Sequence, residues 1–470
     1  PSALKTRPNE SGVPVLQRAL EVHARLNEFI WGPAMIAAIV GVGIFLTAGT
    51  GLVQFRRFGA MLHETLLRRK RDRAEGDISP FAALSTALAG TVGVGNIAGV
   101  ATAIAMGGPG AVFWMWVSGL VGMATKFAEV TLGVAYRQRQ ASGPMVGGPM
   151  MYIERGMGRR FKFLAVLFAA LAGLAAFGIG NMAQANSVAE GLEGFHVPRV
   201  VTGIVLILAV GLVTLGGVER IARVAVFCVP FMCGIYFLGA VIIISLRIQQ
   251  VPEALLLVLR SAVSPVAAVG GFAGAGMRQA IRWGIARGVF SNEAGLGSAS
   301  MAHATAQTDH PVRQGLWGIL EVFIDTIVIC SATALAILVT GAWKSGSTGA
   351  ALTMSAFQTV FGKEVGFSVV ALCMALTAYD TILAWGFYGE TCSAYLFGPR
   401  ARPVYRVLWL GPILVGSLGE LEAVWAVADT LNGLMAVPNL IALAVLSPVV
   451  FRLTKEFFAG SPRPQGAPDS

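Results

Sequence analysis

The sequence predicts an all-α polytopic membrane protein with about eleven transmembrane helices. Of its 470 residues, 55% are hydrophobic and only 13% are charged, whereas soluble domains carry about a quarter charged residues. The chain also holds 58 glycines but 5 cysteines, a balance typical of closely packed or interrupted transmembrane helices. Soluble enzyme folds are therefore excluded for most of the chain.

The N-terminal segment, residues 1–32, places apolar side chains among charges and predicts an amphipathic helix on the membrane surface. A first, extra transmembrane helix follows at 33–54, and residues 452–470 form a cytoplasmic tail. The other apolar stretches long enough to cross a membrane are expected at 80–107, 111–136, 163–188, 200–217, 222–246, 265–287, 315–342, 365–397, 405–419 and 423–451.

The positions of lysine and arginine predict the orientation of these spans. If the N-terminus lies outside, 25 of the 35 basic residues fall in inner loops, 9 fall outside, and Lys126 lies within a span. Because inner loops carry the excess of basic residues, we expect an outside N-terminus and a cytoplasmic C-terminus. Basic residues confined to short loops indicate a lipid bilayer rather than nucleic acid as the partner.

Two glycine clusters, 90–96 and 270–276, interrupt the predicted spans. They occupy matching places in two five-span blocks, 80–246 and 265–451, and an odd number of spans inverts the second block relative to the first. This pattern is typical of inverted-repeat transporters, in which paired broken helices hold substrate and ions at the midplane. Close helix packing alone would also use glycine, but it would not require matching places.

No catalytic or metal-binding constellation is apparent, so we expect no enzyme. The cysteines all lie in apolar runs without metal-ligand spacing, and the histidines are scattered through loops and helix ends. The histidines are His23, His63, His196, His303 and His310.

Charged residues inside spans are costly unless they are paired or face water. Lys126 and Glu129 are three residues apart and share a helix face, so we expect an internal salt bridge between them. Asp429 and Asn432 are expected to form a polar brace between helices.

Glu321 and Asp325, four residues apart, would repel each other without a base, a cation or a proton between them. Candidate bases are Arg278, Arg282 and Arg287, and a structural gate network is favoured over an ion site.

The interruption at 91–96 predicts a binding site. Unwound carbonyls suit a small cation, whereas freed N–H groups at the restarting helix attract a carboxylate. In the span at 365–397, the oxygens of Thr377, Asp380 and Thr381 could close a cation site against those carbonyls. Asp380 at apolar depth favours cation or proton handling over an ion pair with an unseen arginine.

A cluster of amides in the span at 163–188 must be satisfied internally. Asn181, Gln184 and Asn186 could bond neighbouring helices or present acceptors to a substrate ammonium. The sequence leaves both interpretations open.

Six segments resemble the alanine/glycine:cation symporter family of bacterial sodium-coupled transporters, and they recur in order over residues 30–452. They are GTVGVGNIAGVATAIAMGGPGAVFWMW (90–116), GGPMMYIERGMG (147–158), GIGNMAQANS (178–187), GVFSNEAGLGSASMAHA (288–304), ILAWGFYGE (382–390) and DTLNGLMAVPNLIAL (429–443). The resemblance implies a LeuT-type five-helix inverted repeat with one extra N-terminal helix. It also implies import of alanine or glycine with sodium by a monomeric carrier in the cell inner membrane, without an organic cofactor.

The resemblance further implies residue roles. The substrate carboxylate would bind at Thr91, Gly93, Gly95 and Asn96. The ammonium would bind at Gln184 and Thr381, and a small wall would be formed by Phe272, Gly274, Ile382 and Trp385. Sodium would take the carbonyls of Ala89 and Val92 with side-chain oxygens of Thr377, Asp380 or Thr381.

Asp380 departs from the family pattern, in which a serine or threonine is usual at this place. A carboxylate here could tighten sodium binding, or let H+ replace or accompany Na+. A proton-coupled or broader-specificity amino-acid carrier is therefore the alternative.

Overall fold

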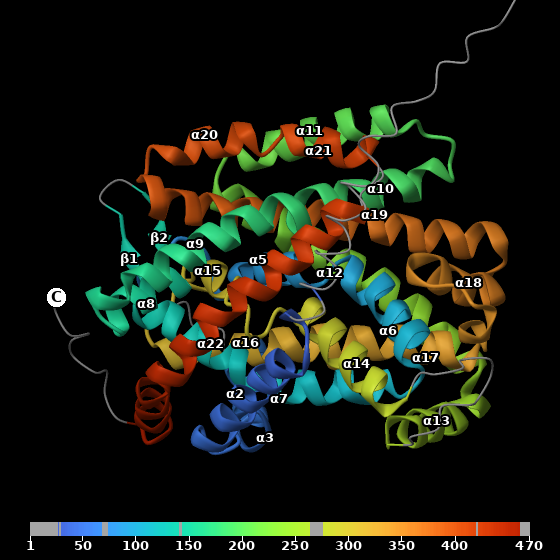
Figure 1. Ribbon diagram of the computed structural model, residues 1–470, viewed down its shortest axis with the longest axis horizontal. Helices are drawn as coiled ribbons and strands as arrows, with labels where there is room; N and C mark the ends of the chain where they lie inside the picture. Colours follow the sequence, from blue (N-terminus) through green and yellow to red (C-terminus); the bar gives the residue numbers. More distant parts are fainter. Residues whose placement is uncertain are drawn as a thin grey trace, which may run out of the picture.

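The computed structural model describes residues 27, 30–67, 74–140, 143–263, 276–419 and 422–460, with the backbone alone for 422–428. The fold is a bundle of long helices packed side by side (Figure 1). In the described part of the chain, the strands are β1 (Gln138–Arg139) and β2 (Met145–Val146), an antiparallel pair in which Gln138 lies opposite Val146. The expected surface helix falls almost wholly outside the described residues.

Six described helices are long and apolar enough to cross a membrane. They are α7 (Ala111–Ala135), the run Arg159–Glu193, α12 (Val218–Leu246), the run Pro311–Val339, α19 (Lys363–Phe397) and the Asp429–Phe458 part of α22 (Glu422–Phe458). The run Arg159–Glu193 contains η3 (Arg159–Phe161), α9 (Lys162–Phe177), η4 (Gly178–Met182) and α10 (Ala183–Glu193). The run Pro311–Val339 contains α16 (Pro311–Val322), η6 (Phe323–Cys330) and α17 (Ser331–Val339).

The other predicted spans coincide with shorter or interrupted helices. α2 (Pro33–Gly49) and α11 (Arg199–Thr214) are apolar but short. The predicted span 405–419 consists of α20 (Ala401–Leu408) and α21 (Gly411–Leu418). By length and composition the described residues thus contain six or seven spans, and the number eleven stays a prediction.

The first predicted helix break is confirmed. α5 (Pro80–Thr91) begins where the Ser79 hydroxyl accepts the amide of Ala82 at 3.2 Å. Three residues separate its end from η2 (Gly95–Gly99), which continues into α6 (Val100–Gly107). The two halves are bent by 51°. Gly93 permits this bend close to α19, since a β-carbon there would lie 3.0 Å from the Thr381 hydroxyl oxygen.

A second interruption lies after α14 (Met277–Asn292) and before α15 (Ala299–His303). Gly295 and Gly297 have φ values of +99° and +81°, a backbone conformation that residues with a β-carbon rarely adopt. The glycine cluster predicted to break this span, 270–276, lies outside the described residues apart from its last glycine. The interruption that the structure describes is in the EAGLGS sequence, 293–298.

The remaining helices connect or flank these elements. They are α3 (Val53–Arg56), α4 (Phe58–Leu62), η1 (His63–Leu67), α8 (Pro149–Gly156), η5 (Ile248–Gln250), α13 (Val251–Val263), η7 (Ala342–Ser345) and α18 (Gly349–Phe361).

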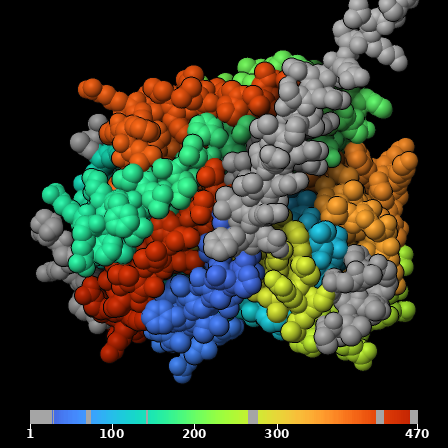
Figure 2. Space-filling view, in the orientation of Figure 1, coloured from blue at the N-terminus to red at the C-terminus, as the bar shows by residue number. Residues whose placement is uncertain are grey.

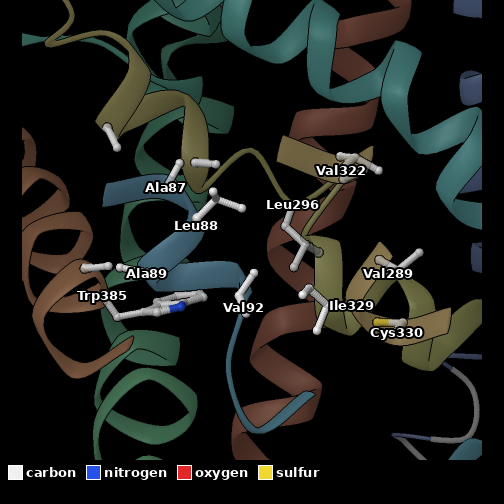
Figure 3. Close-up of a cluster of buried hydrophobic side chains, with 14 of the residues drawn as sticks. Ala87, Leu88, Ala89, Val92, Val289, Leu296, Val322, Ile329, Cys330 and Trp385 are labelled. Atoms are coloured by element: carbon white, nitrogen blue, oxygen red, sulfur yellow. The ribbon is translucent and has the colours of Figure 1, made fainter. Parts of the chain in front are cut away.

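The broken helices lie inside the bundle. α5 packs against α12 and α19, and α14 packs against α7. Buried side chains from α5, α14, η6 and α19 form one apolar cluster around the breaks (Figure 3). Its labelled members include Ala89 and Val92 at the end of α5, beside Trp385 of α19.

The outer faces of the bundle are apolar. Figure 2 shows α9 and α22 side by side on one face. There, Phe163, Leu167 and Leu174 of α9 and Val437, Ile441 and Val445 of α22 are exposed. An exposed apolar surface of this extent is expected where the solvent is lipid rather than water.

Candidate functional site

A small cavity lies between the two helix breaks. The space that the centre of a water molecule can occupy is about 20 Å³, so the cavity has room for about one water. The lining residues come from both breaks, η4, α10, α14, α19 and α22: Gly90, Thr91, Gly93, Val94, Gly95, Ile179, Gln184, Phe290, Glu293, Thr381, Trp385 and Asn432. Six residues predicted to bind substrate therefore meet here: Thr91, Gly93, Gly95, Gln184, Thr381 and Trp385.

Larger hollows lie away from the helix breaks. One of about 950 Å³ lies between the end of α2 and the end of α22, and one of about 440 Å³ lies between α2 and α14. Neither includes a residue of the two interruptions, so we identify the small central cavity as the candidate site.

Asn96 lies outside the cavity lining and braces the first break instead. Its Oδ1 accepts the Gly93 amide at 2.9 Å, and its Nδ2 donates to Asp325 Oδ1 at 2.7 Å. Asp325 also accepts hydrogen bonds from the hydroxyls of Ser291 and Thr326. The amide thus fixes the unwound segment against η6.

The other predicted wall residues do not line the cavity within the described residues. Ile382 is fully buried on α19 but is absent from the lining. Phe272 and Gly274 lie outside the described residues. Phe290 of α14 does line the cavity, and it packs 3.3 Å from the point that a β-carbon on Gly95 would occupy.

Two of the predicted sodium-binding residues, Thr381 of α19 and Ala89 of α5, are in direct contact. The Thr381 hydroxyl donates to the carbonyls of Ala89 at 3.0 Å and Thr377 at 2.9 Å. The Thr377 hydroxyl donates to the Met374 carbonyl. Val92, which caps the end of α5, lies next to Gly93 of the cavity lining.

Asp380 is fully buried on α19, and neither of its carboxylate oxygens has a hydrogen-bond partner. A buried carboxylate without donors is stable only with a cation or a proton. Asp380 lies one position before Thr381, and carboxylate and hydroxyl oxygens are hard ligands that suit a small cation. Groups of three or more His, Cys, Asp or Glu that could hold a metal are absent from the described residues.

Comparisons with known proteins identify the family, because residues 17–466 match the Sodium:alanine symporter family. The chain belongs to this family. It is similar to the sodium/alanine symporter AgcS of Methanococcus maripaludis, with 44% identity over 92% of this chain and 96% of that protein. It is also similar to the "Probable sodium/glutamine symporter GlnT" of Bacillus subtilis, with 37% identity over 92% of this chain and 89% of that protein.

Solved structures confirm the LeuT-type fold. MhsT in complex with L-phenylalanine matches with a TM-score of 0.54 at 13% identity, over 81% of this chain and 99% of that chain. A manganese transporter of Eremococcus coleocola matches with a TM-score of 0.53 at 14% identity, over 85% of this chain and 93% of that chain. Membership of the Sodium:alanine symporter family identifies the protein as a multi-pass sodium-coupled amino-acid symporter rather than an enzyme.

The amide cluster of the symporter divides into two roles. Asn181 donates to the Trp409 carbonyl at 2.8 Å, and Asn186 donates to the Gly419 carbonyl at 2.9 Å, so both tie their helix to neighbours. Gln184 lines the cavity instead. Its Nε2 donates to the Ile179 carbonyl at 2.9 Å, and its Oε1 has no partner.

The predicted salt bridge between Lys126 and Glu129 is not the ion pair that forms. Lys126 Nζ lies 3.2 Å from Glu321 Oε1, because α16 packs against α7 and brings the carboxylate to it. Glu129 accepts the Gly295 amide at 2.9 Å and the Asn439 side chain at 2.7 Å. Lys126 therefore links two helices, and Glu129 supports the second break.

Repulsion between Glu321 and Asp325 is relieved by groups other than the predicted arginines. Glu321 pairs with Lys126, and its Oε2 lies 2.9 Å from His303 Nε2. Arg287 lies 3.9 Å from Asp429 and links α14 to α22.

Sequence reasoning missed Glu293 as a cavity residue. Its φ of +54° places it in the left-handed conformation at the end of α14, where a residue with a β-carbon is uncommon. Glu293 Oε1 accepts the Trp385 indole N–H at 3.1 Å, and Oε2 accepts the Ser298 hydroxyl. An acidic residue inside the glycine-rich EAGLGS segment was the sequence feature that could have identified Glu293 as a site residue.

Proposed function

We propose that this symporter imports a small neutral amino acid, alanine or glycine, together with sodium, by alternating access. The central observation is the cavity between the two helix breaks. Its lining combines glycines of the first break, polar side chains and two aromatic rings: Gly90, Gly93, Gly95, Thr91, Gln184, Thr381, Phe290 and Trp385. The cavity has room for about one water, so it must widen to admit any amino acid, and a substrate with a small side chain needs the least widening. The sodium/alanine description of AgcS supports the same substrate class.

The substrate carboxylate is assigned to the first break. Thr91, Gly93 and Gly95 lie where α5 ends and η2 begins, and amide groups at the start of a helix attract anions. Asn96 acts in this proposal as a positioning residue, because its amide holds the Gly93 N–H and Asp325.

The coupling ion is assigned to the crossing of α5 and α19. The carbonyls of Ala89 and Val92 and the side chains of Thr377, Asp380 and Thr381 supply its oxygens. The unsatisfied Asp380 carboxylate supports a cation at this place. The alternative is a proton on Asp380, which would make the carrier proton-coupled.

The side chains at the wall determine selectivity in this proposal. Trp385 packs on Gly180, where a β-carbon would lie 2.3 Å from the Trp385 β-carbon, so the indole is held close to the cavity. Ile382, Phe272 and Gly274 stay assigned to this wall by the family resemblance alone. A broader carrier is the second candidate, since the glutamine description of GlnT belongs to a relative at 37% identity.

The proposal includes a monomer in the cell inner membrane, with the N-terminus outside and the C-terminus in the cytoplasm. The 25 basic residues assigned to inner loops, against 9 outside, support this orientation.

Uptake into proteoliposomes of the purified protein tests the function. Radiolabelled alanine, glycine and glutamine are supplied with an inward sodium gradient, a proton gradient or neither. We expect saturable accumulation of alanine or glycine with sodium and little glutamine uptake. Accumulation driven by protons alone would support the alternative at Asp380, and no accumulation under any gradient would contradict the proposed function.

A further inference from the structure

A hollow of about 950 Å³ lies where the end of α2 meets the end of α22, outside the central cavity. Figure 1 shows α3, which follows α2, beside the last turns of α22. The volume falls within the range of about 300–1,000 Å³ that is typical of sites for organic ligands. We call it the α2–α22 hollow, and its basic lining residues are Arg56, Arg57, Arg452 and Lys455.

The lining of the α2–α22 hollow carries an excess of positive charge. All four basic residues are exposed, and the lining includes no aspartate or glutamate among the described residues. Glu456 lies 3.9 Å from Arg452, whose side chain is 64% exposed, and so exposed an ion pair contributes little. Because arginine matches phosphate oxygens with paired N–H donors, the hollow suits a phosphate group.

Aromatic contacts hold the two helix ends together around this charge. The guanidinium of Arg57 lies 4.4 Å from the centre of the Phe458 ring, a cation–π contact between α3 and α22. Phe45 of α2 and Phe451 of α22 meet edge to face, with 5.7 Å between their ring centres. A β-carbon on Gly49 would overlap the Phe451 ring, so glycine permits this approach. The basic groups of both helix ends therefore converge on one hollow.

An apolar surface adjoins the basic lining. Phe451 lines the hollow and contacts Phe45, which is itself exposed. Ile44, Leu52 and Phe55, on the same stretch of chain, are exposed as well. A phosphate site beside exposed apolar side chains fits a molecule with an anionic head and hydrocarbon chains better than it fits a free anion.

The place of the hollow in the membrane favours the same ligand. α2 and α22 both end here, and in the proposed orientation both ends lie at the cytoplasmic face. The cytoplasmic leaflet is the one that carries a negative surface potential from anionic lipids, and basic pockets between transmembrane helices on that side bind their head groups.

We propose that the α2–α22 hollow binds the phosphate of an anionic phospholipid, whose acyl chains lie along the exposed apolar side chains of α2 and α3. The inference does not depend on which substrate is transported. Two of the basic residues follow α2 and two belong to α22. The bound lipid therefore links the extra N-terminal helix to the helix that contributes Asn432 to the central cavity.

Lipid binding by the wild-type protein is the first test, measured in detergent by native mass spectrometry, which counts the lipids on each protein. The probes are dioleoyl phosphatidylglycerol, which is anionic, and dioleoyl phosphatidylcholine, which is zwitterionic. Each basic residue near an anionic lipid is worth about fivefold in affinity. The first phosphatidylglycerol should therefore bind about tenfold or more tightly than the first phosphatidylcholine. Equal affinity would overturn the proposal.

Variants then assign the binding to the hollow. Arg57→Gln and Arg452→Gln should each weaken the first phosphatidylglycerol about fivefold, and the double variant about twentyfold or more. Arg452→Lys retains the charge and should retain most of the affinity. The matched control is Arg160→Gln, because Arg160 is exposed and lies 4.8 Å from the Phe161 ring but does not line the hollow. An equal loss in this control would refute the site, since binding would then follow net charge alone.

Soluble phosphates distinguish a lipid from a free anion. Inorganic phosphate and glycerol phosphate carry the anionic group without acyl chains, so neither should displace bound phosphatidylglycerol when added in large excess. Displacement by either would show that the hollow takes a free phosphate and would overturn the lipid assignment. If a variant does not fold, the comparison of the two lipids and the displacement experiment on the wild-type protein decide.

Discussion

At the residue scale, the unsatisfied carboxylate of Asp380 is the strongest single indication of where a cation binds. Both oxygens are buried without partners on a helix that crosses the first break. A serine or threonine at this place could satisfy itself by donating to a carbonyl one turn back, as Thr381 does to Thr377. A carboxylate has no such donor, so it depends on an external positive charge.

Asp380→Asn keeps the shape of the side chain and removes its charge. We expect the sodium concentration for half-maximal alanine uptake to rise about tenfold or more, equivalent to about 1.4 kcal/mol. The matched control is Glu219→Gln, at an exposed acidic position on α12. An unchanged sodium requirement would exclude Asp380 from the sodium site.

The direction in which a buried side chain points cannot be predicted from the sequence alone. Asn181, Gln184 and Asn186 lie within six consecutive positions, yet two of them bond carbonyls of neighbouring segments and one lines the cavity. Residue type indicates that each amide needs partners. Only the neighbouring helices decide which partners are available.

At the element scale, the ion pair between Lys126 and Glu321 joins α7 to α16. Both side chains are fully buried at a separation of 3.2 Å. Removal of one member of a buried pair leaves the other charge uncompensated, which costs about 3–5 kcal/mol. The pair is therefore a sensitive probe of how these two helices pack.

Lys126→Met should lower the thermal unfolding midpoint of the purified protein, with a loss of about 3 kcal/mol or more. The double change Lys126→Met with Glu321→Gln should recover much of that loss, because no buried charge is then unpaired. Lys162→Met is the control, because Lys162 pairs with Glu154 but its side chain is 59% exposed. Loss of such an exposed pair should change the free energy of unfolding by less than about 1 kcal/mol. Additive losses in the double variant would show that the two charges are not coupled.

The contact of η4 with α19 provides a second test at this scale. A β-carbon on Gly180 would lie 2.3 Å from the Trp385 β-carbon, whereas one on Gly173 would lie an ordinary 3.7 Å from that of Cys392. Gly180→Ala should displace Trp385 and reduce alanine uptake about tenfold or more, since overpacking costs about 1–3 kcal/mol. Gly173→Ala is the matched control, because it makes the same substitution in the same helical run. It should transport like wild type. Normal uptake by Gly180→Ala would show that the packing of Trp385 on η4 does not limit transport.

At the scale of the whole molecule, the topology predicts which surfaces a reagent can reach from outside the cell. Thr348 precedes α18 and is exposed, and Arg160 in η3 is exposed as well. With an outside N-terminus these positions lie on opposite sides of the membrane. The native cysteines are buried or half-buried in the bundle.

A membrane-impermeant thiol reagent should therefore label Thr348→Cys in intact cells. It should label Arg160→Cys only after the membrane is permeabilised. The unmodified protein is the background control. The reverse pattern would invert the orientation while leaving the fold unchanged.

The sequence by itself determined the class of the protein, the approximate positions of its long helices and the first break. Hydropathy and glycine spacing depend on residues that are close in sequence, so they can be read along the chain. The family followed from motifs of nine or more residues, and the match over residues 17–466 confirms it.

Only the tertiary structure decided which polar groups meet. Lys126 pairs with Glu321, 195 positions away, rather than with Glu129 one turn along, and Glu293 reaches the cavity beside Trp385. Partner choice inside a bundle depends on which helix faces which, and that depends on the packing of the whole molecule. A buried charge takes the partner that packing brings within reach, because water is not there to serve as one.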